Sequence, residues 1–243
     1  MGHDRQAAPC SKVDVVGKLA QRFGYRNYLE VCTPSTGNEY AQVQDIGFAS
    51  ARRLMYLSPL SFSDGMKLDF QCPDEDITDA VSQLQGSGIG IDICLVDGWH
   101  RYETACRDIA AVSGLLADGG AMVVHDCLPP NREVASPRFR RGAWCGVSYK
   151  AYLDFVLGDP SLDYFTVDCD YGCGVIFKGF PVGDDWKGLV PACPDASLVR
   201  AWLGTKDDHD AAFDLFEQHK SELLRLVSTR DFEAMLAAGA GPP

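Results

Sequence analysis

The chain has 243 residues, of which 46% are hydrophobic and 23% charged, and its formal net charge is -12. This composition suits one globular α/β domain and excludes a disordered or fibrous chain. The charge and the lack of a basic run argue against a nucleic-acid partner, and no apolar stretch reaches the roughly 20 residues that cross a bilayer. We therefore expect a cytoplasmic protein without membrane contacts. Its ten cysteines are scattered singly, which favours free thiols over disulfides.

The first predicted elements alternate between helix and strand. Apolar residues at helical spacing predict a leading helix over 12–23. A strand over 28–32 then runs into a loop of turn-forming residues at 33–37, after which helical spacing resumes. Two short strands are predicted next, at 53–57 and near 67–71.

The centre of the chain continues this alternation with longer elements. A helix is predicted over 76–86. The apolar run 91–96 is typical of a parallel strand covered on both faces, and it ends abruptly at Asp97. A helix over 102–116 and an apolar strand over 121–124 follow.

The last third of the chain predicts a helix, a hairpin and two more helices. Residues 146–157 have helical spacing, and the strands 163–168 and 173–178 are close enough to form a hairpin. Apolar stripes predict helices over 208–227 and 231–238.

Together these seven strands and their intervening helices predict an α/β fold. We expect a doubly wound, Rossmann-like, seven-stranded sheet that is mainly parallel and closes with the antiparallel hairpin. Residues 1–180 would form this domain, and 181–243 a helical C-terminal extension packed on it. Ligands of such sheets bind beyond the carboxyl ends of the strands, which directs attention to the residues that follow them.

Two aspartates follow the two strongest predicted strands. Asp97 and Asp126 should meet at one edge of the sheet, where paired carboxylates suit a divalent cation such as Mg²⁺. Each could equally cap the next helix or turn. His100, three residues after Asp97, is a candidate general base, with a plain surface histidine as the alternative.

Other polar residues near this edge have weaker signals. His125 could join Asp126 in a metal site, but a packed histidine is the favoured interpretation. The three loop arginines could hold an anionic substrate or simply face solvent, at Arg138, Arg140 and Arg141. The loop after the first strand could wrap a small ligand with its backbone, and Gly37 would allow close approach.

Several motifs resemble one known family. They are the segment LVDGWHRYE at 95–103, then Asp108, Gly119-Gly120, and Val-His-Asp at 124–126. This pattern resembles the small class I S-adenosylmethionine (SAM)-dependent methyltransferases with an Asp-Gly-x-His-x-Tyr signature, the methyltransferase-24-like group. The resemblance implies SAM binding at Glu30, Thr33, Gly37 and Asp97. It further implies Mg²⁺ at Asp97 and Asp126, with His100 and Asp97 in the catalytic site.

The implied reaction is SAM-dependent O-methylation of a hydroxyl on a small molecule or a sugar. Two features depart from the family pattern: Cys32 and Pro34 replace the usual loop glycines, and the second strand lacks the acidic residue that binds ribose. They motivate an alternative, a non-catalytic protein of this fold that binds another ligand or partner. A metal-dependent hydrolase built on His125 and Asp126 is a third and weaker hypothesis. The C-terminal helices could support a homodimer or cover their own sheet.

Overall fold

The structure is a computed structural model that describes residues 10–33, 42–43, 45–56, 70–72, 76–179, 186 and 188–238. Its strands are β1 (Asn27–Cys32), β2 (Ser50–Tyr56), β3 (Phe70–Cys72), β4 (Ile91–Asp97), β5 (Leu116–Val124), β6 (Asp163–Asp168), β7 (Cys173–Phe177) and β8 (Leu226–Ser228). Its helices are α1 (Lys12–Phe23), α3 (Thr78–Gly86), α4 (Tyr102–Leu115), α5 (Ser148–Gly158), α6 (Ala196–Gly204), α7 (His209–Leu223) and α8 (Thr229–Ala238).

The strands form one sheet in the order β3-β2-β1-β4-β5-β7-β6-β8. Only β7 runs antiparallel to its neighbours, because it returns from β6 through a tight turn. The seven predicted strands and their hairpin are therefore confirmed. The short β8 pairs with β6 and extends the sheet by an eighth strand that the sequence analysis did not predict.

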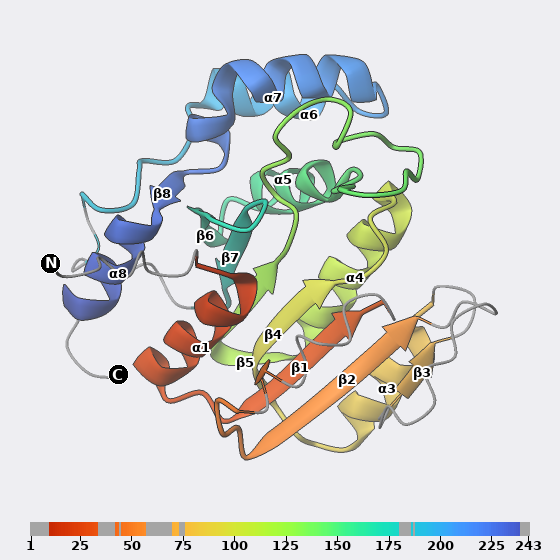
Figure 1. Ribbon diagram of the computed structural model, residues 1–243, viewed down its shortest axis with the longest axis vertical. Helices are drawn as coiled ribbons and strands as arrows, with labels where there is room; N and C mark the ends of the chain where they lie inside the picture. Colours follow the sequence, from red (N-terminus) through yellow and green to blue (C-terminus); the bar gives the residue numbers. More distant parts are fainter. Residues whose placement is uncertain are drawn as a thin grey trace, which may run out of the picture.

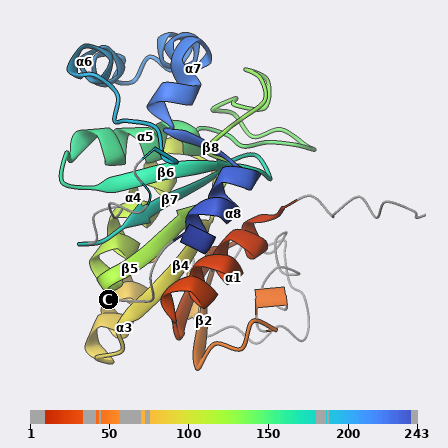
Figure 2. The same cartoon turned by 90° about the vertical axis from the view of Figure 1, so that its left-hand side faces the viewer.

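Helices cover both faces of the sheet, as a doubly wound fold requires (Figures 1 and 2). On one face, the helices α3, α4 and α5 pack over an apolar core that continues beneath α6 and α7. On the other face, α1 and α8 cover a second core that includes Val16, Leu19 and Phe232. Because both faces are covered, the edge beyond the carboxyl ends of the strands is left for ligand binding.

The first helix is anchored at both ends. At its start, Ser11 and Asp14 form a capping box in which the Ser11 hydroxyl accepts a hydrogen bond from the Asp14 amide. At its end, Gly24 takes the left-handed conformation. The next residue, Tyr25, donates a hydrogen bond to the carbonyl oxygen of Gly119 (2.6 Å). This anchoring holds the first turn of α1 at the carboxyl edge of the sheet.

The C-terminal region differs in detail from the prediction. The predicted helix 208–227 is the shorter α7, and a further helix, α6, precedes it. The apolar stripe of α7 packs inside the same chain, where Tyr149 contacts Phe213 and Phe216. These aromatic side chains therefore cover the chain's own core and are not available to a second copy. The division at residue 180 stays a prediction.

Two broader expectations can be compared with the structure. All ten cysteines lie in the described part of the chain and are free thiols, as expected. No helix among the described residues is long and apolar enough to cross a membrane.

Candidate active site

Strand register brings the predicted site residues to one edge of the sheet. Cys32, the last residue of β1, pairs with Asp97, the last residue of β4. Val96 pairs with Val124, so the residues that follow β5 lie beside Asp97. The convergence of Asp97 with Asp126 therefore follows from parallel pairing of adjacent strands.

Asp97 lies at the centre of this edge, and only 4% of its surface is exposed. Its Oδ2 accepts a hydrogen bond from Lys12 Nζ at 2.7 Å, and its Oδ1 lies 3.3 Å from ring nitrogens of His100 and His125. Burial alone would raise the pKa of this carboxyl. The adjacent His125, His100 and Lys12 outweigh burial and hold the pKa well below its usual range. Asp97 is therefore a buried carboxylate.

His100 points one ring nitrogen between the two predicted aspartates. Its Nε2 lies 3.3 Å from Asp97 Oδ1 and 3.2 Å from Asp126 Oδ2. Its Nδ1 lies 2.9 Å from the carbonyl oxygen of Trp144, which can only accept, so Nδ1 carries a proton. Burial would lower the pKa of His100, but the two carboxylates raise it overall. A neutral His100 therefore presents its lone pair on Nε2, toward the carboxylates.

His125 is a member of the same cluster and more than a packed side chain. Its Nδ1 lies 3.3 Å from Asp97 Oδ1 and 3.5 Å from Asp126 Oδ2. Its Nε2 donates to the backbone oxygen of Asp170 at 2.6 Å. Burial would lower the pKa of His125, but Asp126 and Asp97 raise it well above the usual value. We infer that His125 is a protonated bridge between the carboxylates.

Two of these residues have strained backbone. Asp126 has a φ of 62° and Asp170 a φ of 45°, in the left-handed region that residues other than glycine seldom adopt. The conformation turns the chain sharply after β5 and between β6 and β7. Such strain is typical of residues held in place for function.

Glu30 lies on the neighbouring strand and is 1% exposed. Its Oε2 accepts a hydrogen bond from the Tyr28 hydroxyl at 2.8 Å. Its Oε1 is buried, and no donor among the described residues meets hydrogen-bond geometry there, although the Cys32 thiol interacts with this carboxyl and lowers its pKa. Burial raises the pKa of Glu30 to about 7. An unsatisfied carboxyl oxygen at the end of β1 is a position where a ligand could donate.

The remaining predicted residues have different outcomes. Thr33 directly follows β1 and is buried, whereas Gly37 lies outside the described residues. The three loop arginines are exposed, and Arg140 pairs with Glu133. Their exposure agrees with the alternative in which the three arginines simply face solvent.

Comparison with known proteins tests the family. Residues 14–127 match the family model described as a methyltransferase domain. Residues 14–127 are a methyltransferase domain. The sequence has no match among curated proteins. The match bears out the predicted resemblance for residues 14–127, and with it the prediction of a methyltransferase domain.

Solved structures with similar folds agree with this assignment. The chain is similar to the cofactor-bound protein Rv0187 from MTB, at 16% identity over 72% of this chain and 83% of that one, with a TM-score of 0.50. It is also similar to the O-methyltransferase TomG from Streptomyces achromogenes, involved in tomaymycin synthesis and solved with SAM. That match has 13% identity, covers 70% of this chain and 80% of TomG, and has a TM-score of 0.52. At these identities the likeness establishes the fold.

The methyltransferase site brings together three groups that could hold a metal. One ligand atom each from Asp97, His100 and Asp126 lies within 4.8 Å of the others. Mg²⁺ prefers oxygen ligands in octahedral geometry and retains several waters. Here both oxygens of Asp97 and the Oδ2 of Asp126 already lie against nitrogen atoms of Lys12 or the histidines. This arrangement does not fit Mg²⁺, and metal binding at Asp97 and Asp126 stays a prediction.

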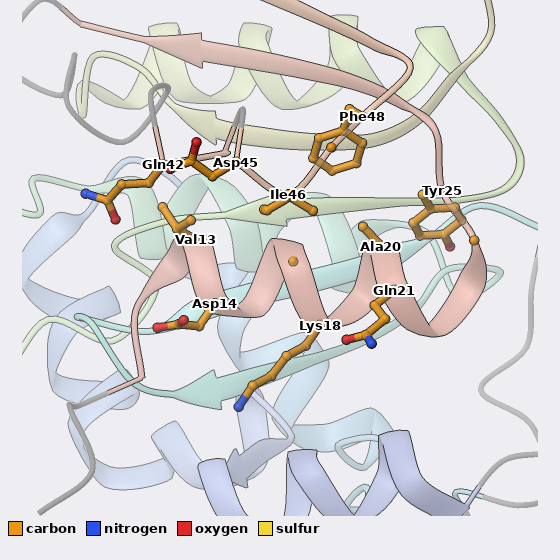
Figure 3. A pocket seen from close by; sticks show the side chains of 13 residues that line it. Val13, Asp14, Lys18, Ala20, Gln21, Tyr25, Gln42, Asp45, Ile46 and Phe48 are labelled. Carbon is orange, nitrogen blue, oxygen red and sulfur yellow. The ribbon is translucent and has the colours of Figure 1, made fainter.

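A cavity of about 750 Å³ lies elsewhere, between α1 and the residues 42 and 45–48 (Figure 3). Ile46 and Phe48 line the wall of this cavity that lies across from α1. No described residue of the predicted site lines this cavity. Beneath His100, the described residues enclose a space of about 10 Å³, which is too small for a substrate. We therefore assign no role in methyl transfer to the large cavity.

Three residues of the site were missed in the sequence. Trp144 lies in a loop and gave no signal. Asp170 looked like an ordinary turn residue, although its turn follows a strand that ends at the same edge. Lys12 could have been noticed in the sequence. It lies in the first turn of a helix, where a positive charge is unfavourable because it opposes the helix dipole.

Gly146 determines how closely the loop packs on His100. Its φ is 54°, and an added Cβ would lie 2.7 Å from the His100 Cβ and closer still to its carbonyl oxygen. We expect Gly146→Ala to lower the free energy of unfolding by about 1–3 kcal/mol, because neighbouring atoms must move. Urea denaturation of the wild type and the variant measures this loss.

Gly142→Ala is the matched control. Gly142 also has a positive φ, 93°, but a Cβ added there would have no described atom within 4 Å. Both variants therefore share backbone strain, and only one has the contact. Equal losses of stability would show that the contact with His100 is unimportant.

Proposed function

We propose that this methyltransferase transfers the methyl group of SAM to a hydroxyl oxygen of a small molecule or sugar. The observation that carries the proposal is the position of His100. Its Nε2 lies between two carboxylates at the ends of β4 and β5, beside the end of β1. A base at that position can take a proton from an acceptor that lies across the strand ends.

The cofactor would bind at the end of β1, with Glu30, Thr33, Gly37 and Asp97 as its contacts. When bound, SAM supplies a methyl group on a positively charged sulfur, which an oxygen nucleophile can attack. The buried Glu30 Oε1 supports this placement, since the amino group of SAM could donate the missing hydrogen bond. Cys32 ends β1 and Thr33 begins the loop that follows, and both residues are buried.

The acceptor hydroxyl would lose its proton to His100 Nε2 as its oxygen bonds to the methyl carbon. Bound SAM would supply the methyl group, and the sulfur of the SAH product would keep the electron pair of the carbon–sulfur bond. Asp97 and Asp126 then stabilise the imidazolium, while the Trp144 carbonyl oxygen keeps the ring oriented through Nδ1. The raised pKa of His100 makes it a strong base whenever Nε2 is unprotonated.

Aromatic side chains beside His100 support a small organic acceptor. The Trp99 ring stacks on Phe139 with centroids 5.5 Å apart, and Trp144 packs against both. Phe139 is 57% exposed, which is unusual for a large apolar side chain. These rings offer a face against which an aromatic ring or the apolar face of a sugar can pack.

Calorimetry with SAM and its product S-adenosylhomocysteine (SAH) tests the cofactor. We expect both to bind the wild type, and Glu30→Gln to weaken binding by about 10- to 150-fold, because a hydrogen bond to a charged group is lost. Glu103→Gln, an exposed change on α4, is the control. If neither compound binds the wild type, the alternative of a non-catalytic protein of this fold replaces the proposal.

A further inference from the structure

A lysine is buried in the acidic cluster of the active site. Lys12, the first residue of α1, is 6% exposed, and its Nζ lies 2.7 Å from Asp97 Oδ2. Lysine is almost never buried to this extent unless it is paired. The ion pair joins residues that are 85 positions apart in the sequence. The N-terminal helix therefore contributes a positive charge to the site.

A second contact fixes the position of this lysine. Its backbone amide donates to Asp170 Oδ2 at 3.0 Å, and the carbonyl oxygen of Asp170 accepts from His125. The capping box of Ser11 and Asp14 defines the same turn of α1. Lys12 is thus attached through its backbone to one carboxylate and through its side chain to another.

The cluster already has basic groups facing its carboxylates. Asp97, Asp126 and Asp170 lie against Lys12, His100 and His125. The Asp97 oxygens are both engaged, one by the ammonium and one by the two imidazoles. A divalent ion on Asp97 would lie next to the Lys12 ammonium, and like charges repel strongly in a buried site. The lysine and a metal ion are therefore alternatives at this carboxylate.

We propose that Lys12 is the resident cation of the site, where it takes the place on Asp97 that a divalent metal would need. As a positioning residue, it keeps Asp97 oriented toward His100 and His125 without contacting the acceptor. Wild-type methyl transfer then needs no divalent metal. This last consequence rests on the proposed function, whereas the metal binding described next does not.

Mn²⁺ binding, followed by the electron paramagnetic resonance of the free ion, tests the proposal without any methyl acceptor. Lys12→Met keeps the length of the side chain and removes its charge. Suppose that the Lys12 ammonium is away from Asp97 in at most about one molecule in ten. Removing the ammonium should then lower the dissociation constant of Mn²⁺ about tenfold or more. Lys12→Arg retains the charge and should bind Mn²⁺ as weakly as the wild type.

Lys18→Met is the control on the same helix, because Lys18 pairs with Glu233 at the surface and forms no ion pair or hydrogen bond with a described residue of the site. It should leave Mn²⁺ binding unchanged. Adding Asp97→Asn to Lys12→Met should abolish the gain. Equal binding by the wild type and Lys12→Met would overturn the proposal.

A second measurement does not depend on the folding of Lys12→Met. In the wild-type background, Asp97→Asn should leave weak Mn²⁺ binding unchanged, since Lys12 already occupies the carboxylate. A marked loss of Mn²⁺ binding in Asp97→Asn would show that the metal reaches Asp97 despite Lys12, and would overturn the proposal. With an acceptor at hand, chelator should not slow the wild type. If a chelator slows methyl transfer by the wild type and added Mn²⁺ restores the rate, the proposal is also overturned.

Discussion

Replacing His100 with glutamine should slow methyl transfer by about 10²- to 10⁴-fold, the usual contribution of a general base. Glutamine is polar and can hydrogen-bond to the Trp144 carbonyl oxygen that holds the ring, but it cannot accept the proton of the acceptor hydroxyl. The base acts on the acceptor and not on the cofactor, so SAM affinity should change little. The expected result is a large loss in turnover with retained binding.

The measurement is the rate of SAH formation with an acceptor that the wild type methylates, found by screening phenols, alcohols and sugars. His219→Gln is the matched control, because His219 lies on α7 with 41% of its side chain exposed. Full activity of His100→Gln would remove His100 from the reaction. Loss of both turnover and SAM binding would instead indicate damage to the site as a whole.

Replacing Glu30 with glutamine should stabilise the ligand-free protein at high pH. The pKa of Glu30 is raised from 4.5 to about 7 in the folded state. Between these values the folded state holds more protons than the unfolded state, so this group's contribution to stability falls as pH rises. The loss is complete above about pH 7 and amounts to about 3 kcal/mol, at 1.36 kcal/mol for each unit of pKa shift.

Glutamine resembles protonated glutamate, so the two proteins should be similarly stable at pH 4. At pH 8, Glu30→Gln should exceed the wild type by that amount in the free energy of unfolding from urea titrations. Glu103→Gln, on the exposed side of α4, should show no such pH-dependent gain. If the difference between Glu30→Gln and the wild type does not change with pH, Glu30 is not held in an apolar environment.

Much of the fold could be predicted because its strands are apolar runs with sharp ends. The run 91–96 corresponds to β4, and its end at Asp97 is the end of the strand. The hairpin of β6 and β7 followed from two strands separated by a short turn. The elements that were missed are short or depend on distant partners. For example, the three-residue β8 exists only because it pairs with β6.

Part of the site could also be predicted from the sequence. Asp97 and Asp126 follow neighbouring parallel strands, and parallel strands end at the same edge, so their convergence needed no knowledge of side-chain contacts. His100 was identified as a candidate because it follows Asp97 by three residues. The sequence favours a packed histidine at position 125, because only its neighbour Asp126 is adjacent in the chain. Its second partner, Asp170, is distant in the sequence and is brought close only by the fold.

By itself, the sequence determined the order of the seven predicted strands and most helices, the resemblance of residues 14–127 to methyltransferases and the carboxylates at the sheet edge, because hydrophobic spacing and strand ends are local properties. Only the tertiary structure decided which charges surround those carboxylates. Lys12 reaches Asp97 across 85 residues, and its amide reaches Asp170 across 158. Such contacts depend on how α1 packs across the sheet and how the β6–β7 turn bends, and burial then makes them strong by excluding water.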